Sequence, residues 1–180
     1  MTDRSGGHAP LRALQRTGTH YYPSRGLHLI DVENLLGTAV PDPVEVRCLR
    51  ARYLVLAGVG GLDQVVIASS HLALKNTGDW WPRARYLVRS GPDGADRELL
   101  DVMDREHVAE RFCRVTIASG DGAFARGAAD LVTAGCQVIV VSRRAGLSAR
   151  LALAVGGRVT YIDPPGARTP PPAARASQAA

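Results

Sequence analysis

The chain has 180 residues, the length of one domain with short extensions, and 46% hydrophobic and 22% charged residues, as in a globular protein. This composition excludes a wholly disordered chain, and no apolar run approaches the ~20 residues that a membrane span needs. The first residues lack the apolar centre of a signal peptide, so we expect a cytoplasmic protein. Three isolated cysteines predict reduced core thiols rather than disulfides or a zinc site: Cys48, Cys113 and Cys136.

The formal net charge of +5 lies outside the predicted domain. Residues 1–25 and 164–180 carry the excess arginines, and both segments are predicted to be disordered because they offer little apolar surface. The predicted domain, residues 26–163, is neutral overall. The basic extensions could attract a polyanion in a salt-dependent way, but the net charge indicates nothing about a site within the domain.

Strand and helix signals alternate along the predicted domain. In chain order the pattern predicts strand 27–32, helix 43–57, strand 64–68, helix 71–75, strand 84–88, helix 94–112, strand 114–118, helix 124–134, strand 137–141, helix 147–155 and strand 158–162. The strands are continuous apolar runs, which is typical of a parallel sheet buried on both faces. The sequence therefore predicts a three-layer α/β/α sandwich around a mostly parallel sheet. On helix 43–57 the inward face is predicted to hold Val46, Leu49, Tyr53 and Leu56.

Polar side chains follow several of these strands, where an α/β sheet usually places its site. Asp31 and Asn34 follow the first strand, Asp96 lies beyond the third, and Ser119 and Asp121 follow the fourth. Helix capping explains any one of these aspartates at least as well as chemistry does. Three carboxylates at one edge, however, repel each other unless a cation such as Mg²⁺ neutralises them. Two arginines follow the fifth strand at the same edge: Arg143 and Arg144.

Three motifs in this order resemble the NYN domain family, which belongs to the PIN-like nucleases. The motifs are Asp31-x-x-Asn34, Gly94-Ala95-Asp96-x-x-Leu99 and Ser119-Gly120-Asp121-x-x-Phe124, and the resemblance covers residues 27 to about 162. It implies a PIN-like fold and a metal-dependent ribonuclease activity. In that family the positions of Asp31, Asp96 and Asp121 bind Mg²⁺ or Mn²⁺, and those of Asn34 and Ser119 complete the catalytic site.

The resemblance implies hydrolysis of RNA within the chain, in the manner of an endoribonuclease, by a water that the metal activates. Arg143 and Arg144 are then candidates for binding RNA phosphates, with two solvated loop arginines as the equal alternative. Glu33 is expected to point away from a ligand of Asp31. Trp80 and Trp81 are expected to pack rather than to stack on bases.

One position departs from the family pattern. The last motif commonly carries a second acid where this chain has Ala123, which weakens the expected metal site and leaves one or two metals open. Asp93 is the best substitute ligand. A second hypothesis is therefore an RNA-binding module without catalysis, and a third is an interaction or nucleotide-binding module on the same fold. No membrane partner is expected. The sequence leaves open whether the substrate is RNA or DNA and whether the protein forms a homodimer.

Overall fold

A computed structural model describes residues 25–78 and 80–163, so the two extensions predicted to be disordered lie outside the described residues except for Arg25. The described chain forms one six-stranded sheet in the order β3-β2-β1-β4-β5-β6, and every neighbouring pair is parallel. The strands are β1 Gly26–Asp31, β2 Gln64–Ser69, β3 Arg85–Val88, β4 Arg114–Ala118, β5 Gln137–Ser142 and β6 Val159–Tyr161.

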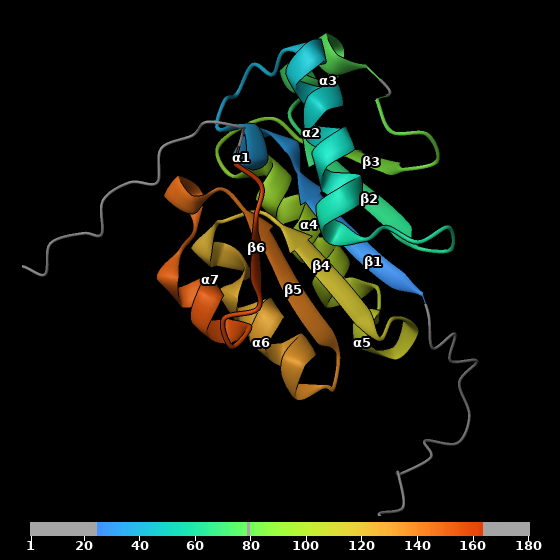
Figure 1. The fold of residues 1–180 in the computed structure, drawn as a ribbon, viewed down its shortest axis with the longest axis vertical. Coiled ribbons are helices and arrows are strands. Elements are labelled where there is room, and N and C mark those ends of the chain that lie inside the picture. Colours follow the sequence, from blue (N-terminus) through green and yellow to red (C-terminus); the bar gives the residue numbers. More distant parts are fainter. Residues whose placement is uncertain (1–24, 79, 164–180) are drawn as a thin grey trace, which may run out of the picture.

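Helices connect the strands and cover both faces of the sheet (Figure 1). They are α1 Val32–Leu36, α2 Pro43–Ala57, α3 His71–Thr77, α4 Gly94–Arg105, α5 Val108–Arg111, α6 Ala125–Thr133 and α7 Ala149–Ala154, with short 3-10 turns η1 Gly122–Phe124 and η2 Arg144–Gly146. The predicted three-layer α/β/α sandwich is confirmed, and its sheet is wholly parallel. None of the helices in the described part of the chain combines the length and the apolarity needed to cross a bilayer.

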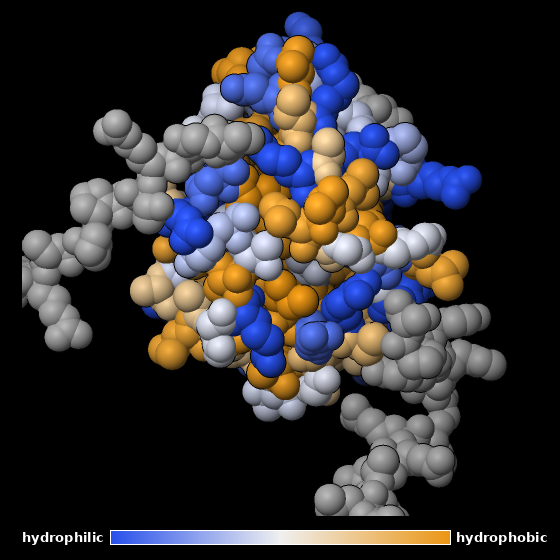
Figure 2. Space-filling model, in the orientation of Figure 1, coloured by the Kyte–Doolittle hydropathy of each residue, from blue (hydrophilic) through white to orange (hydrophobic). Residues whose placement is uncertain are grey.

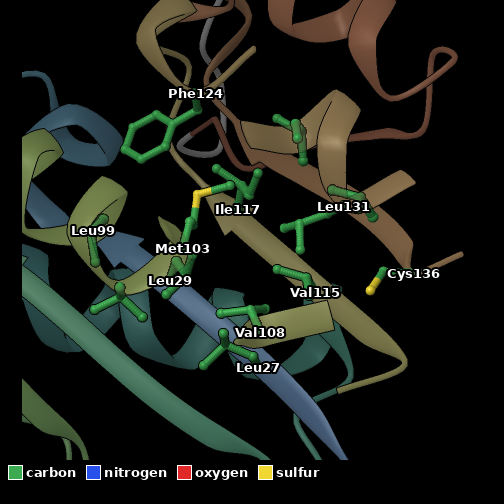
Figure 3. Packing of buried hydrophobic residues seen from close by; sticks show 14 of the residues in the cluster. Leu27, Leu29, Leu99, Met103, Val108, Val115, Ile117, Phe124, Leu131 and Cys136 are labelled. Atoms are coloured by element: carbon green, nitrogen blue, oxygen red, sulfur yellow. The ribbon is translucent and has the colours of Figure 1, made fainter. Parts of the chain in front are cut away.

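Alternation along the strands divides the core into two clusters. Leu27 and Leu29 of β1 point to the face covered by α4, α5, α6 and α7, and Figure 3 shows them with Met103 and other residues of that cluster. Ile30 of β1 points to the opposite face, where α1 and α2 pack. Because every strand of the centre is buried on both sides, burial of these apolar side chains is the main favourable term in folding, at about 25 cal/mol per Å².

The structure corrects the predicted helices in three places. Helix 94–112 is broken after Arg105, and α5 begins at Val108 after His107, which has a positive φ of 50°; Val108 and Phe112 are buried in the core. Leu56 is exposed rather than inward, because the face of α2 that packs on the sheet consists of Val46, Leu49 and Tyr53. The helix α1 has no counterpart in the prediction.

The tryptophan pair packs as predicted. Trp80 and Trp81 are buried and lie edge to face, and Trp81 also contacts the ring of Tyr53 from α2. Such aromatic contacts contribute about 0.5–1.5 kcal/mol beyond the area that they bury. The pair therefore belongs to the core between α2 and the start of β3.

Candidate functional site

A cleft of about 440 Å³ opens beyond the carboxyl ends of β1, β2 and β3. Its polar lining comes from the first residues after these strands and from the start of α4. The charged and amide side chains of the lining are Asp31, Glu33, Asn34, Arg89, Asp93 and Asp96. The strand order reverses between β1 and β4, where doubly wound sheets place their ligands; the cleft begins beside this point, at the end of β1, and extends toward β2 and β3.

Asp31 ends β1 and begins α1. Its side chain is 4% exposed, and Oδ1 accepts a hydrogen bond of 3.0 Å from the backbone N–H of Asn34, which caps the helix. Burial raises the pKa of the Asp31 carboxyl above its ordinary value, although that hydrogen bond and one to Asp96 oppose the shift. Capping and burial therefore hold one carboxyl at the floor of the cleft.

Asp96 stands in the first turn of α4 and is 8% exposed. Burial, followed by the negative charge of Asp31, raises the pKa of Asp96 to about 7, and the charges of Asp121 and Asp93 add to the effect. The two carboxyls lie close enough to share a hydrogen bond when one of them is protonated. When both are ionised, Oδ1 of Asp96 is buried with no hydrogen-bond donor in the described part of the chain.

Packing requires the glycine that lies two residues before Asp96. A Cβ on Gly94 would lie 2.2 Å from the backbone oxygen of Arg89, so only glycine lets the start of α4 approach the end of β3 this closely. Asp93, in front of it, adopts a left-handed conformation with φ of 55° and is exposed at the cleft. The predicted substitute ligand thus shares the cleft with Asp31 and Asp96.

Asp121 approaches from β4 and does not line the cleft. Its Oδ1 accepts a 2.7 Å hydrogen bond from the N–H of Ala123 and caps η1, and its N–H donates to the buried hydroxyl of Ser119. Asn34 holds this loop in place, because its Oδ1 accepts a 2.9 Å hydrogen bond from the N–H of Gly120. A Cβ on Gly120 would lie 2.1 Å from the oxygen of Gly146, which explains the glycine of this motif.

The structure therefore brings Asp31 and Asp96 into contact and holds Asp121 near enough for its charge to act on Asp96. Across residues 25–78 and 80–163, no three acidic, histidine or cysteine side chains are arranged so that they could hold a metal ion together. The roles predicted for Asn34 and Ser119 become positioning roles in this geometry, since their side chains contact the loop that carries Asp121.

Arg143 and Arg144 both contact other parts of the protein. Nε of Arg143 donates a 3.0 Å hydrogen bond to the backbone oxygen of Asn34, and the guanidinium packs against Gly37, where a Cβ would lie 2.4 Å from it. The side chain of Arg144 pairs with Asp163 at 3.6 Å and stacks 4.0 Å from the ring centre of Tyr161. These contacts tie the loop after β5 to its neighbours.

Two residues of the cleft lining were not among the predicted site residues. Arg89 is the cationic side chain that lines the cleft, and its ion pair in the described part of the chain is with Glu98 at 3.5 Å, with both side chains partly exposed. Glu33 accepts two hydrogen bonds from Ser70, one from its N–H at 2.9 Å and one from its hydroxyl at 2.8 Å. The signal for Arg89 was its place after the third strand. Glu33 points, as expected, to a partner other than a ligand of Asp31.

The carboxyl oxygens of the cleft are ligands of the kind that a hard divalent cation prefers. Two carboxyls whose pKa values are raised, one with an oxygen that lacks a donor, and an exposed Asp93 on the same cleft offer the oxygen ligands that Mg²⁺ and Mn²⁺ prefer. Mg²⁺ usually keeps several waters and takes one or two protein carboxylates, so two converging acids suffice as its protein ligands.

Comparison with known proteins adds little to this geometry. No protein-family model matches the chain, and no curated protein is similar to it in sequence. A solved structure, a hypothetical protein from Trypanosoma cruzi, is similar over 78% of this chain and 80% of that one, with 15% identity and a TM-score of 0.37.

Proposed function

We propose that the cleft hydrolyses phosphodiester bonds of RNA with the help of Mg²⁺ or Mn²⁺. The observation that carries the proposal is the pair Asp31 and Asp96, two buried carboxyls in contact at the floor of an open cleft. Their mutual repulsion is an unfavourable term that a divalent cation removes. The resemblance to NYN domains, carried by the motifs around Asp31, Asp96 and Asp121, supports the same activity.

In this proposal different residues bind the cation, bind the RNA and position the loop of Asp121. Asp31 and Asp96 would hold the cation, which when bound would polarise the scissile phosphate and lower the pKa of a water. Arg89 lies on the same cleft and would bind a backbone phosphate of the RNA, because its guanidinium can donate two hydrogen bonds to phosphate oxygens. Asn34 and Ser119 hold the loop of Asp121, whose charge adds to the negative potential at Asp96.

The test is cleavage of labelled single-stranded RNA by the full chain with Mn²⁺ or Mg²⁺. We expect cleavage that EDTA abolishes and that Asp31→Asn and Asp96→Asn each reduce by about 100-fold or more, since each removes a charged ligand. The matched control is Asp101→Asn, the same change on the outer surface of α4, which should leave the rate unchanged. Cleavage that survives EDTA, or equal rates in all three variants, contradicts the proposal.

One observation favours a second candidate, an RNA-binding module without catalysis. Asp121 uses Oδ1 to cap η1, and Ala123 supplies no carboxylate beside it, so the third acid of the predicted set is drawn away from the pair. In that case the full chain binds the RNA without cleaving it in either metal. Binding that Arg89→Ala weakens would then locate the RNA in the same cleft.

A further inference from the structure

The helix α2 is apolar on two opposite faces. Val46, Leu49 and Tyr53 are buried against the sheet, and a second row faces outward with a spacing of four, three and four residues. The outward row consists of Val44, Cys48, Ala51 and Val55, all exposed, so the prediction of a core thiol is wrong for Cys48. A surface helix normally turns a charged face to water, and this spacing is the seam of a two-stranded coiled coil.

Exposed apolar side chains concentrate on this helix. Of the nine large hydrophobic side chains that are exposed in the described part of the chain, five lie on α2 or in the turn after it. These five are Val44, Leu54, Val55, Leu56 and Leu62. Figure 2 shows the apolar atoms running along α2 between hydrophilic borders. A contiguous patch with polar borders is typical of a surface that another protein covers.

We propose that the outward face of α2 pairs antiparallel with the same face of a second copy of this chain. In a two-fold arrangement of this kind Val44 of one copy faces Val55 of the other, and Cys48 faces Ala51. Small side chains then meet at the centre, where the two helices approach most closely, and the larger valines meet at both ends. The seam is self-complementary in size.

Charge complementarity supports a second copy as the occupant. The positions that flank this seam on one side are Glu45 and Arg52, and antiparallel pairing places Glu45 of one copy beside Arg52 of the other, twice by symmetry. Within the described chain neither residue is part of an ion pair. The pairing would supply both with a partner.

The first experiment measures the mass of the full chain in solution by light scattering and by sedimentation, over a range of concentrations. We expect a dimer that Val55→Arg converts to a monomer, because this residue is 83% exposed and its change leaves the fold intact. The matched control is Leu153→Arg, which changes an 82% exposed leucine on α7 and should leave the dimer unaffected. Circular dichroism confirms that both variants fold.

The second experiment tests the register with charge reversal. Glu45→Arg and Arg52→Glu should each raise the dimer dissociation constant about three- to tenfold, and the double variant should return it close to the original value. A wild-type monomer at all concentrations overturns the proposal, as does a dimer that Val55→Arg leaves intact or that Leu153→Arg dissociates equally. Failure of the double variant to restore affinity overturns the antiparallel register. Since none of these variants touches the cleft, the outcome is independent of the proposed nuclease.

Discussion

The two ends of β1 bury charged groups in opposite ways. At the amino end His28 is fully buried, with Nδ1 2.9 Å from the hydroxyl of Tyr53 and Nε2 3.2 Å from Oδ2 of Asp63. Asp63 also accepts hydrogen bonds from the N–H groups of Gly26 and Gly60 and from the guanidinium of Arg114. Burial alone would raise the pKa of Asp63, but these donors lower it below the ordinary value.

At the carboxyl end the carboxylates meet each other instead of donors. Asp31 and Asp96 each have a raised pKa, and one oxygen of Asp96 has no donor in the described chain. At the amino end donors surround the carboxylate of Asp63, although Nε of Arg114 lacks a hydrogen-bond partner within the described chain. A buried carboxylate that is surrounded by donors is stabilised, whereas carboxyls that face each other are destabilised, so the two ends of β1 should contribute to stability with opposite signs.

The largest expected effect comes from removing the carboxylate of Asp63 at the amino end of β1. Asp63→Ala removes the acceptor of four donors and should lower the free energy of unfolding by about 3 kcal/mol, because buried donors lose their partner. Urea denaturation followed by circular dichroism measures the change. Asp104→Ala, on the exposed surface of α4, is the control and should change stability by less than about 0.5 kcal/mol. A similar small loss for Asp63→Ala would show that its network contributes little.

Neutralising Asp96 at the carboxyl end of β1 should have the opposite effect and raise the free energy of unfolding. The pKa of Asp96 is about 7 in the folded protein against an ordinary value of 3.8, so the folded state holds the proton more tightly. Its contribution to stability is complete below pH ~4 and is lost as the pH rises through ~7. Asp96→Asn should remove this loss and raise the free energy of unfolding at pH 8 by about 2 kcal/mol. Urea curves of both proteins from pH 4 to 8 provide the measurement, and parallel pH profiles would contradict the assignment.

A divalent cation should relieve the same repulsion. Mn²⁺ at ten times its dissociation constant should stabilise the protein by about 1.4 kcal/mol, visible as a rise in Tm at pH 7.5. Asp31→Asn should abolish the rise, and Asp101→Asn should retain it. An equal rise in the wild type and in Asp31→Asn would place the binding of Mn²⁺ elsewhere.

The smallest expected effect concerns RNA binding by the cleft. Arg89→Ala should weaken the binding of single-stranded RNA about fivefold, measured by fluorescence anisotropy in EDTA so that cleavage does not interfere, and it should reduce the salt dependence. Arg105→Ala is the matched control, because its side chain is 77% exposed on the far end of α4 and pairs only with Asp101. Equal losses in both variants would indicate a diffuse electrostatic contact.

Much of the fold was predictable because its signals are local. Strand β4 and helix α2 have the predicted bounds, since an apolar run and a Pro43 start with a glycine after Ala57 depend on near neighbours alone. The inward position of Val108 was predictable from the helical pattern, but the break at His107 was not, because that pattern runs through it without interruption. Glu33 was not predicted as part of the cleft because its partner, Ser70, lies 37 residues away in the chain. Arg89 was not predicted because only the folded cleft shows that its side chain shares a lining with Asp31 and Asp96.

Apolar periodicity and strand direction depend on near neighbours alone, so the alternation of strands and helices, the parallel sheet and the edge that carries Asp31, Asp96 and Asp121 were all predictable from the sequence. Which acids meet was not predictable: Asp31 and Asp96 share the floor of the cleft, and Asp121 caps η1 beyond its lining. Side-chain direction at a loop depends on hydrogen bonds between segments distant in the chain, such as that from Gly120 to Asn34, and these form only in the folded protein.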